Sequence, residues 1–208
     1  QCLRYPGARV YAFDKDRSIR IATLCAGGKF HDIGAHARGG DTIGFQPLAY
    51  IDDPEELTWA TEWLYDLLSK AGVDLTPEDK NHIGEKLASL ASSPVEERTL
   101  TVLRARLGDK TLKEALQPFT VGGTFGHLLD GDRDELNMGR WQAFEMGSLL
   151  KQPTVAAPVM TYLFHRIEQA LDGSPTLLII DEGWRFLDDT TFAAKIEDWL
   201  FTLRKKKV

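Results

Sequence analysis

The sequence predicts an α/β protein with a mostly parallel sheet and an inserted helical subdomain. Strand-like segments at 8–14 and 176–181 are separated by helical segments, and strands joined through helices run parallel with right-handed crossovers. Three helix-start signals follow one another within 53–96. The 208 residues suffice for one substantial domain with an insertion.

The first segments alternate between strand and helix. Residues 8–14 are β-rich and alternate in polarity, which predicts a strand that ends at Asp14. A polar loop and a short helix over 18–26 follow, and two glycines end that helix. A short strand is expected at 29–33 and a glycine-rich loop at 34–44.

The middle of the chain is predicted to be helical. Asp53 can cap a helix whose first residue is Pro54, and Thr76-Pro77 repeats this start signal. Ser93-Pro94 is a third start, with Glu96 placed for a capping box. We therefore expect core segments at 1–52 and 136–208 around a helical insertion at 53–135, with helices over 53–71, 76–92, from 93 onward and 111–119.

The last part returns to alternating strands and helices. The pattern predicts a strand at 141–147, a helix at 153–171, a strand at 176–181 and a helix at 190–204. The four apolar residues 177–180 suit a strand that is buried on both faces.

Two acids, Asp181 and Glu182, stand at the carboxyl end of that strand. Ligands of open α/β sheets bind at this end of the strands. An acid pair there can hold a magnesium ion and activate a water, which is the chemistry that a nucleotide hydrolase needs, and the pattern is that of a Walker B strand. Acids are also common at strand ends by chance, so both interpretations stay open on this motif alone.

A phosphate-binding loop is not found within the chain. Gly28-Lys29 is the place to look, but Phe30 stands where the loop needs a hydroxyl residue and Thr23 where it needs glycine. We interpret the two glycines before Lys29 as a helix stop.

Other polar residues allow two interpretations. Asp14 and Asp16 follow the first strand, so they are either solvated loop acids or contacts to a nucleotide or its water. His31 and His36 have no third ligand nearby and are expected to be solvated loop histidines.

Composition narrows the class of protein. The chain is 43% hydrophobic and 27% charged, as in soluble globular proteins. A net charge of -6 disfavours a broadly basic nucleic-acid surface, although a local one is compatible with it. No apolar run approaches the roughly 18 residues that cross a bilayer. Cys2 and Cys25 lack zinc-like spacing, which favours reduced thiols in the cytoplasm.

Taken together, these segments resemble the CagE/TrbE/VirB family of ATPases of type IV secretion and conjugative transfer systems. The TrbE-like branch is the most similar, chiefly in the block 45–49. Two departures are Gly183, where the family often has alanine, and Gln46, where many members have asparagine. The matching blocks occur in the family's order at 8–16, 44–48, 120–128, 144–146, 179–184 and 196–206.

The resemblance implies a RecA-like P-loop NTPase core, incomplete here, with an inserted helical subdomain. It implies ATP and Mg²⁺ as cofactors, with Asp181 holding the magnesium through water and Glu182 polarising the attacking water as the catalytic residue. The family's phosphate loop lies upstream of Gln1 and its sensor and arginine motifs beyond Val208. We therefore expect this chain to be a fragment of the motor domain that is inactive when isolated, although the intact protein is an ATPase.

The resemblance also implies partners and a location. We expect other secretion-channel subunits, a homo-oligomer (a hexamer in the intact protein), a DNA or protein substrate, and peripheral association with the cytoplasmic face of the bacterial inner membrane. One alternative is an FtsK/HerA-like DNA translocase, which the net charge mildly disfavours. The other is a non-catalytic scaffold subunit of the channel that binds partners through the helical insertion.

Overall fold

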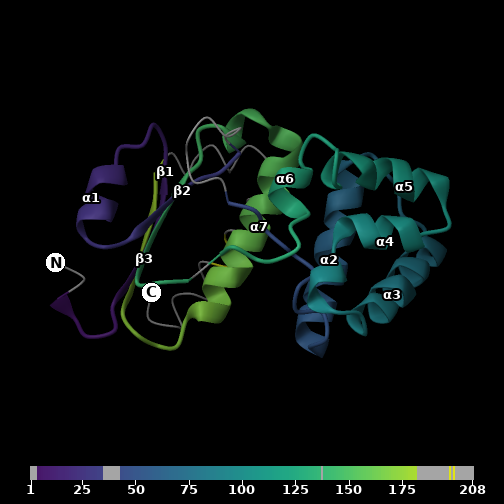
Figure 1. Cartoon of the computed structure of the whole chain (residues 1–208), viewed down its shortest axis with the longest axis horizontal. Coiled ribbons are helices and arrows are strands. Elements are labelled where there is room, and N and C mark those ends of the chain that lie inside the picture. Colours follow the sequence, from purple (N-terminus) through teal and green to yellow (C-terminus); the bar gives the residue numbers. More distant parts are fainter. Residues whose placement is uncertain (1–3, 35–42, 137, 182–196, 198, 200–208) are drawn as a thin grey trace. The chain divides into compact units, whose positions relative to one another are not determined.

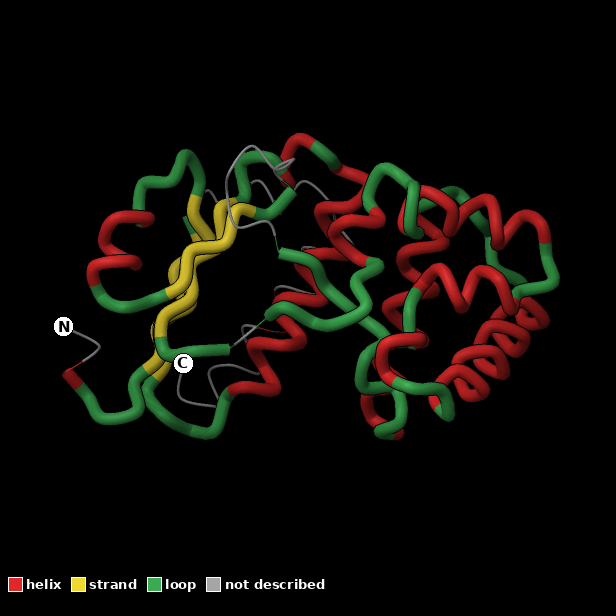
Figure 2. Tube along the Cα trace, in the orientation of Figure 1, coloured by secondary structure: helices red, strands yellow, loops and turns green. Residues whose placement is uncertain are grey.

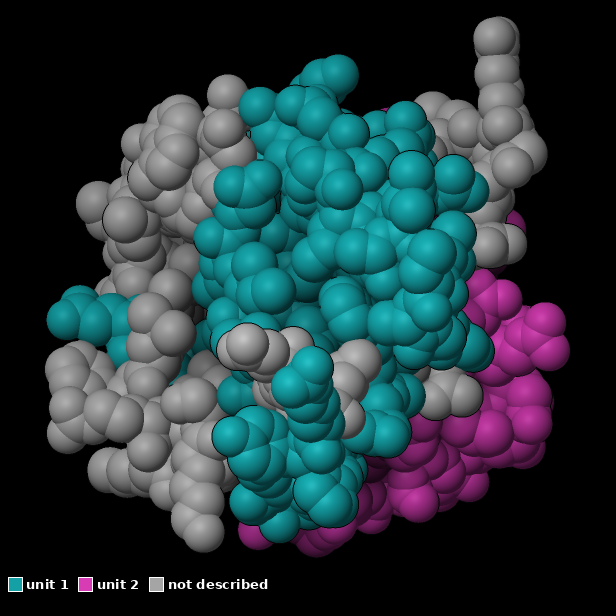
Figure 3. Space-filling model, turned by 90° about the vertical axis from the view of Figure 1, so that its left-hand side faces the viewer, with its two compact units in different colours: residues 1–43, 137–208 teal, residues 44–136 magenta. Residues whose placement is uncertain are grey.

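The computed structural model describes residues 4–34, 43–136, 138–181, 197 and 199 (Figures 1 and 2). Two compact units emerge, one formed by residues 1–43 and 137–208 and the other by 44–136 (Figure 3). The first unit contains β1 (Arg9–Asp14), α1 (Arg20–Cys25), β2 (Lys29–Asp32), β3 (Trp141–Glu145), η4 (Leu149–Lys151), α7 (Pro153–Ala170) and β4 (Thr176–Ile180). The second contains α2 (Pro54–Lys70), α3 (Pro77–Ala91), η2 (Val95–Glu97), α4 (Leu100–Arg106), α5 (Lys110–Leu116), η3 (Gln117–Phe119) and α6 (Gly126–Leu129).

The described strands of the first unit form one parallel sheet in the order β2-β3-β1-β4. β1 is central, with Phe13 opposite Phe144 of β3 and Ile180 of β4. The expected parallel arrangement is therefore found. The predicted helix at 190–204 lies outside the described residues except for Glu197 and Trp199, both of which are helical.

The two faces of the sheet are covered by different helices, α1 on one side and α7 on the other (Figures 1 and 2). Phe13 packs against Phe144 and edge-on against Phe164 of α7, with ring centroids 5.3 Å apart in each pair. Its neighbour Ala12 points to the opposite face. There it joins a buried cluster with Phe30 and Ala143, against which Ile19 packs just before α1.

The second unit is built from capped helices, as predicted. Asp53 accepts hydrogen bonds from the backbone at the start of α2, and Thr76 forms a capping box with Asp79 at the start of α3. These caps satisfy N–H groups that would otherwise lack partners in the first turn. The buried residues of α2 and α3 are Ala60, Trp63, Leu64, Leu67, Leu68, Ile83, Leu87 and Leu90.

The helix predicted to start at Ser93 is wrong. The segment forms a single 3₁₀ turn, and α4 begins only after Thr99, whose side chain accepts from the N–H of Val102. The side chain of Arg98 donates to the carbonyls of Ser93 and Ala49 at 3.0 and 2.8 Å, which holds the backbone out of a helix at this point. Gln46 is buried and donates to the carbonyl of Arg98.

In the structure, the boundaries between the two units fall between residues 43 and 44 and between residues 136 and 137. The sequence placed its domain boundaries after residues 52 and 135. Those domain boundaries stay a prediction. Among the described residues, no helix is both long and apolar enough to span a bilayer.

Candidate functional site

Four acids stand side by side at the carboxyl edge of the sheet. Asp32, Glu145 and Asp14 end β2, β3 and β1, and the register pairs Glu145 with both of the others. Asp181 directly follows β4, and its N–H donates to the carbonyl of Phe13 at 2.9 Å. The strand order therefore brings together acids that are far apart in the sequence, at the edge where parallel sheets bind ligands.

Asp14 is engaged by its own loop. It is buried, its Oδ2 accepts from the N–H of Ile19 at 3.0 Å, and its Oδ1 accepts from the hydroxyl of Ser18. These bonds hold the turn that leads into α1. Its contact to a nucleotide stays a prediction.

The loop after Asp14 has an unusual backbone. Asp16 and Arg17 have φ angles of 66° and 58°, in the left-handed region that L side chains rarely adopt. Each such residue costs about 1–2 kcal/mol. The carboxylate of Asp16 is exposed and lies 4.0 Å from Nζ of Lys15. The role of Asp16 at a nucleotide stays a prediction.

Glu145 holds this strained loop. Its carboxylate is buried, and Oε2 accepts from the N–H of Arg17 at 2.6 Å. Oε1 accepts from the N–H of Asp16 at 3.3 Å and from that of Gly147 at 2.8 Å. The sequence marks Glu145 only as part of the block 144–146 that resembles the family. No local pattern indicates its contact with Arg17, which lies 128 residues earlier.

Arg17 extends over the edge of the sheet to β2. Its Nε donates to Oδ2 of Asp32 at 3.2 Å, and its Nη2 bonds the same oxygen. The hydrogen bond to Asp32 raises the pKa of Arg17 above its ordinary value. Since β3 lies between β1 and β2, the side chain crosses the end of the strand that carries Glu145.

Asp181 is an exposed residue at this edge, and Glu182 lies outside the described residues. Within the described ranges, no three histidine, cysteine or acidic side chains are grouped to hold a metal ion. Magnesium does not require such a cage, because it keeps several waters and binds through one or two carboxylates plus substrate phosphates. An exposed carboxylate at the strand end thus fits a magnesium ion that arrives with a nucleotide.

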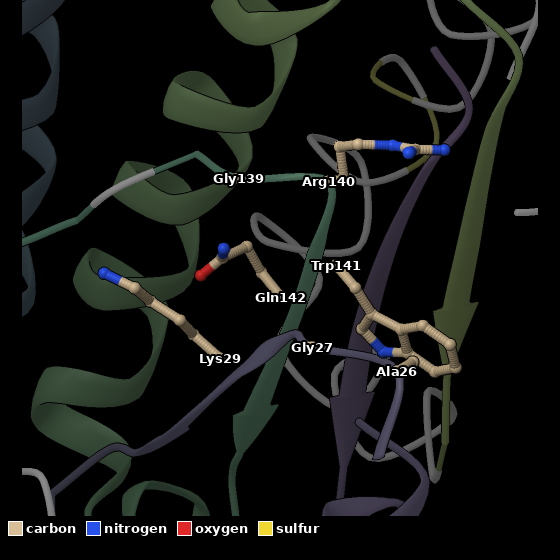
Figure 4. A pocket seen from close by; sticks show the side chains of 7 residues that line it. All are labelled: Ala26, Gly27, Lys29, Gly139, Arg140, Trp141 and Gln142. Carbon is tan, nitrogen blue, oxygen red and sulfur yellow. The ribbon is translucent and has the colours of Figure 1, made fainter. Parts of the chain in front are cut away.

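A cavity of about 310 Å³ lies at the opposite, amino edge of β2 and β3 (Figure 4). In the close view, the side chains of Lys29 and Arg140 point away from each other. Their charges therefore do not converge on one ligand, and the carboxyl edge remains the better candidate. The cavity is lined by Ala26, Gly27, Lys29, Gly139, Arg140, Trp141 and Gln142.

His31 corrects an expectation from the sequence. It is buried in β2, its Nε2 lies 2.7 Å from Oε1 of Gln142, and its ring stacks on Phe144 at 5.4 Å. The expectation of a solvated loop histidine is wrong here, because His31 lies on β2 and its ring packs against side chains of the neighbouring strand β3. His36 lies outside the described residues.

Comparison with known proteins shows relatives over nearly the whole chain, although no protein-family profile matches it. The chain is 38% identical over 99% of its length to a probable conjugal transfer protein TrbE of Sinorhizobium fredii and to the conjugal transfer protein TrbE of Rhizobium radiobacter. It is 30% identical over 93% of its length to the type IV secretion system protein virB4 of Bartonella henselae. The chain spans 31% of the first relative and 25% of the other two.

A solved structure shares the fold. VirB4 of Thermoanaerobacter pseudethanolicus superposes with a TM-score of 0.71, covering 96% of this chain and 84% of that one at 18% identity. The predicted fold class, an incomplete RecA-like α/β core with an inserted helical subdomain, is thereby confirmed.

Proposed function

Because this chain is a TrbE- and VirB4-type sequence over nearly its whole length, we propose that the intact protein is an ATPase motor that energises type IV secretion or conjugal transfer. The observation that carries the proposal is the position of Asp181. It follows a strand of the parallel sheet at the carboxyl edge and hydrogen-bonds to the neighbouring strand β1. This is where a Walker B acid acts.

In this proposal, Asp181 helps to hold a magnesium ion through a water molecule, and Glu182 polarises the attacking water. A bound magnesium ion supplies positive charge that neutralises the phosphate oxygens during transfer. Asp14 and Asp16 stand at the same edge and are proposed to lie near the nucleotide. ATP and Mg²⁺ are accordingly the cofactors that we propose.

The names of the relatives, a conjugal transfer protein and a type IV secretion system protein, support a proposal about partners. We propose that the intact protein assembles as a homo-oligomer, a hexamer, with other subunits of a secretion channel at the cytoplasmic face of the inner membrane. The substrate moved by the machine is DNA or protein. The rival proposal is a scaffold without catalysis that binds partner subunits through the helical insertion.

The test is phosphate release by the purified intact protein with ATP and Mg²⁺. Glu182→Gln and Asp181→Asn are expected to lower kcat by about 100-fold or more, as expected for groups that act in the transition state. Asp172→Asn is the matched control, since this exposed acid lies before β4 at the amino edge of the sheet. The segment 1–208 alone is expected to hydrolyse ATP negligibly. Normal turnover and substrate transfer by the Glu182→Gln protein would support the scaffold instead.

A further inference from the structure

The loop formed by Lys15, Asp16 and Arg17 carries strain that local sequence does not explain. Among the described residues other than glycine, Asp16 and Arg17 are those with positive φ, and they are consecutive. Strained backbone persists only where the surroundings enforce it, and it is frequent at active sites. The strained backbone of Asp16 and Arg17 therefore points to a neighbouring group that enforces it and to a side chain that it holds in place.

The buried carboxylate of Glu145 enforces it. Successive N–H groups that turn toward one side of the chain form a concave anion site. Here the N–H groups of Asp16 and Arg17 both point at this carboxylate, at 3.3 and 2.6 Å. Gly147, two residues after the end of β3, also donates its N–H to Oε1 of Glu145, and a Cβ atom at Gly147 would lie 2.6 Å from that oxygen. Glu145 thus acts as a fixed internal anion that holds the loop in one shape.

The group presented by this shape is the guanidinium of Arg17. Its side chain is 57% exposed and is tied to Asp32 at the carboxyl edge. Its Nε and Nη2 donate to Asp32, so the N–H groups of Nη1 are the donors of this guanidinium that can bind a phosphate oxygen. The loop follows β1, the strand beside β4 and Asp181. Arg17 is therefore held on the carboxyl edge, the edge at which the nucleotide is proposed to bind, with its guanidinium at the end of β2 and with β3 and β1 between β2 and β4.

We propose that Glu145 is a positioning residue for ATP turnover, which fixes the loop of Lys15, Asp16 and Arg17 so that Arg17 meets the phosphate oxygens of the nucleotide. This inference rests on the proposed ATPase function. Glu145 itself touches no substrate, and its effect passes through the backbone of the loop.

The test measures kcat and KM for ATP, and thermal stability, in variants of the intact protein. Glu145→Gln places an amide donor against backbone donors, and Gly147→Ala displaces the carboxylate. Each is expected to lower kcat/KM by about tenfold or more below the melting temperature. Asp130→Asn is the matched control, because Asp130 is also a buried carboxylate that accepts two backbone N–H groups, from Thr101 at 3.0 Å and Val121 at 2.7 Å, but in the helical unit. It is expected to lose similar stability and to change kcat/KM by less than about twofold.

A second variant, Asp16→Gly, separates the positioning role of Glu145 from a general loss of stability. Asp16→Gly removes the part of the backbone strain that Asp16 carries, because glycine adopts positive φ about as readily as negative φ. In an Asp16→Gly background, the effect of Glu145→Gln is expected to fall to less than about threefold. Equal activity losses for Glu145→Gln and Asp130→Asn, or an undiminished effect in the glycine background, would overturn the inference. If Glu145→Gln does not fold, Gly147→Ala takes its place in the comparison with Asp130→Asn.

The two proposals fail differently. If the unmodified protein does not hydrolyse ATP, or if Glu182→Gln leaves turnover unchanged, the ATPase function is wrong and this inference falls with it. If turnover depends on Glu182 but not on Glu145, only the positioning role is wrong.

Discussion

Asp14 shows how a charge at the end of a strand becomes part of a local turn. Its carboxylate is 3% exposed, and it accepts from the N–H of Ile19 and the hydroxyl of Ser18. A buried carboxylate needs such donors, because its removal from water is otherwise strongly unfavourable. The same donors hold the start of α1 against the sheet.

Replacing Asp14 with alanine is expected to lower the free energy of unfolding by about 1–3 kcal/mol, because buried donors lose their acceptor. Urea unfolding of the purified protein measures the loss. Asp74→Ala, at an exposed loop position of the helical unit, is the control and should change stability by less than about 0.5 kcal/mol. Equal stability of the two variants would show that the bonds of Asp14 contribute nothing.

At the residue scale, the sequence indicated where acids end strands but not which partners they find. Asp14 and Asp181 were recognised because each stands at the end of a predicted strand. The role of Glu145 depends on the register of β3 against β1, and two of its three N–H donors lie 128 and 129 residues earlier in the chain. No local pattern contains that information, so the hydrogen bond from the N–H of Arg17 to Glu145 could not be predicted.

Helices with side-chain caps were the elements that the sequence located best. Asp53-Pro54 and Thr76-Pro77 predicted the starts of α2 and α3, since a cap followed by proline is a local signal with a local cause. Ser93-Pro94 is the same signal, yet it starts only a 3₁₀ turn. There the side chain of Arg98 bonds the carbonyl of Ser93 within the turn and that of Ala49, 49 residues away, so these contacts outweigh the local preference.

The capping box of α3 should make stability depend on pH. Oδ2 of Asp79 accepts from the N–H and the hydroxyl of Thr76 at 3.0 and 2.7 Å, and the hydroxyl bond is the largest cause of the lowered pKa of Asp79. A carboxyl whose folded pKa is depressed stabilises the fold above its unfolded pKa, and this stabilisation is lost as pH falls through the folded pKa.

The stability difference between the unmodified protein and Asp79→Asn is therefore expected to be full at neutral pH. It should shrink as pH falls below the ordinary value of 3.8 and vanish below the folded pKa. Urea midpoints measured across this range give the difference at each pH. Thr76→Ala should remove most of the pH dependence, because it deletes the hydroxyl donor. A difference that is constant from neutral to strongly acidic pH would contradict the assignment.

At the scale of the whole molecule, β4 is the least protected element of the sheet. It is an edge strand among those described, and Leu177 and Ile179 are 43% and 37% exposed. Both project from the face that Ala12 shares, as the register with β1 shows. Strands of parallel sheets are normally covered on both faces. An exposed apolar edge is instead a template for pairing with another chain.

We therefore predict that the purified segment 1–208 self-associates, because β4 is an edge strand of the described sheet and carries exposed apolar side chains. Light scattering should show a mass that rises with protein concentration. Leu177→Lys together with Ile179→Lys should shift the segment toward the monomer, since charges on an edge strand oppose pairing. Val121→Lys is the control, because Val121 is 73% exposed in the helical unit and lies on no strand. A monomer with a sharp two-state melt at all concentrations would contradict this prediction. It would show that the edge at β4 is already protected from pairing with another chain.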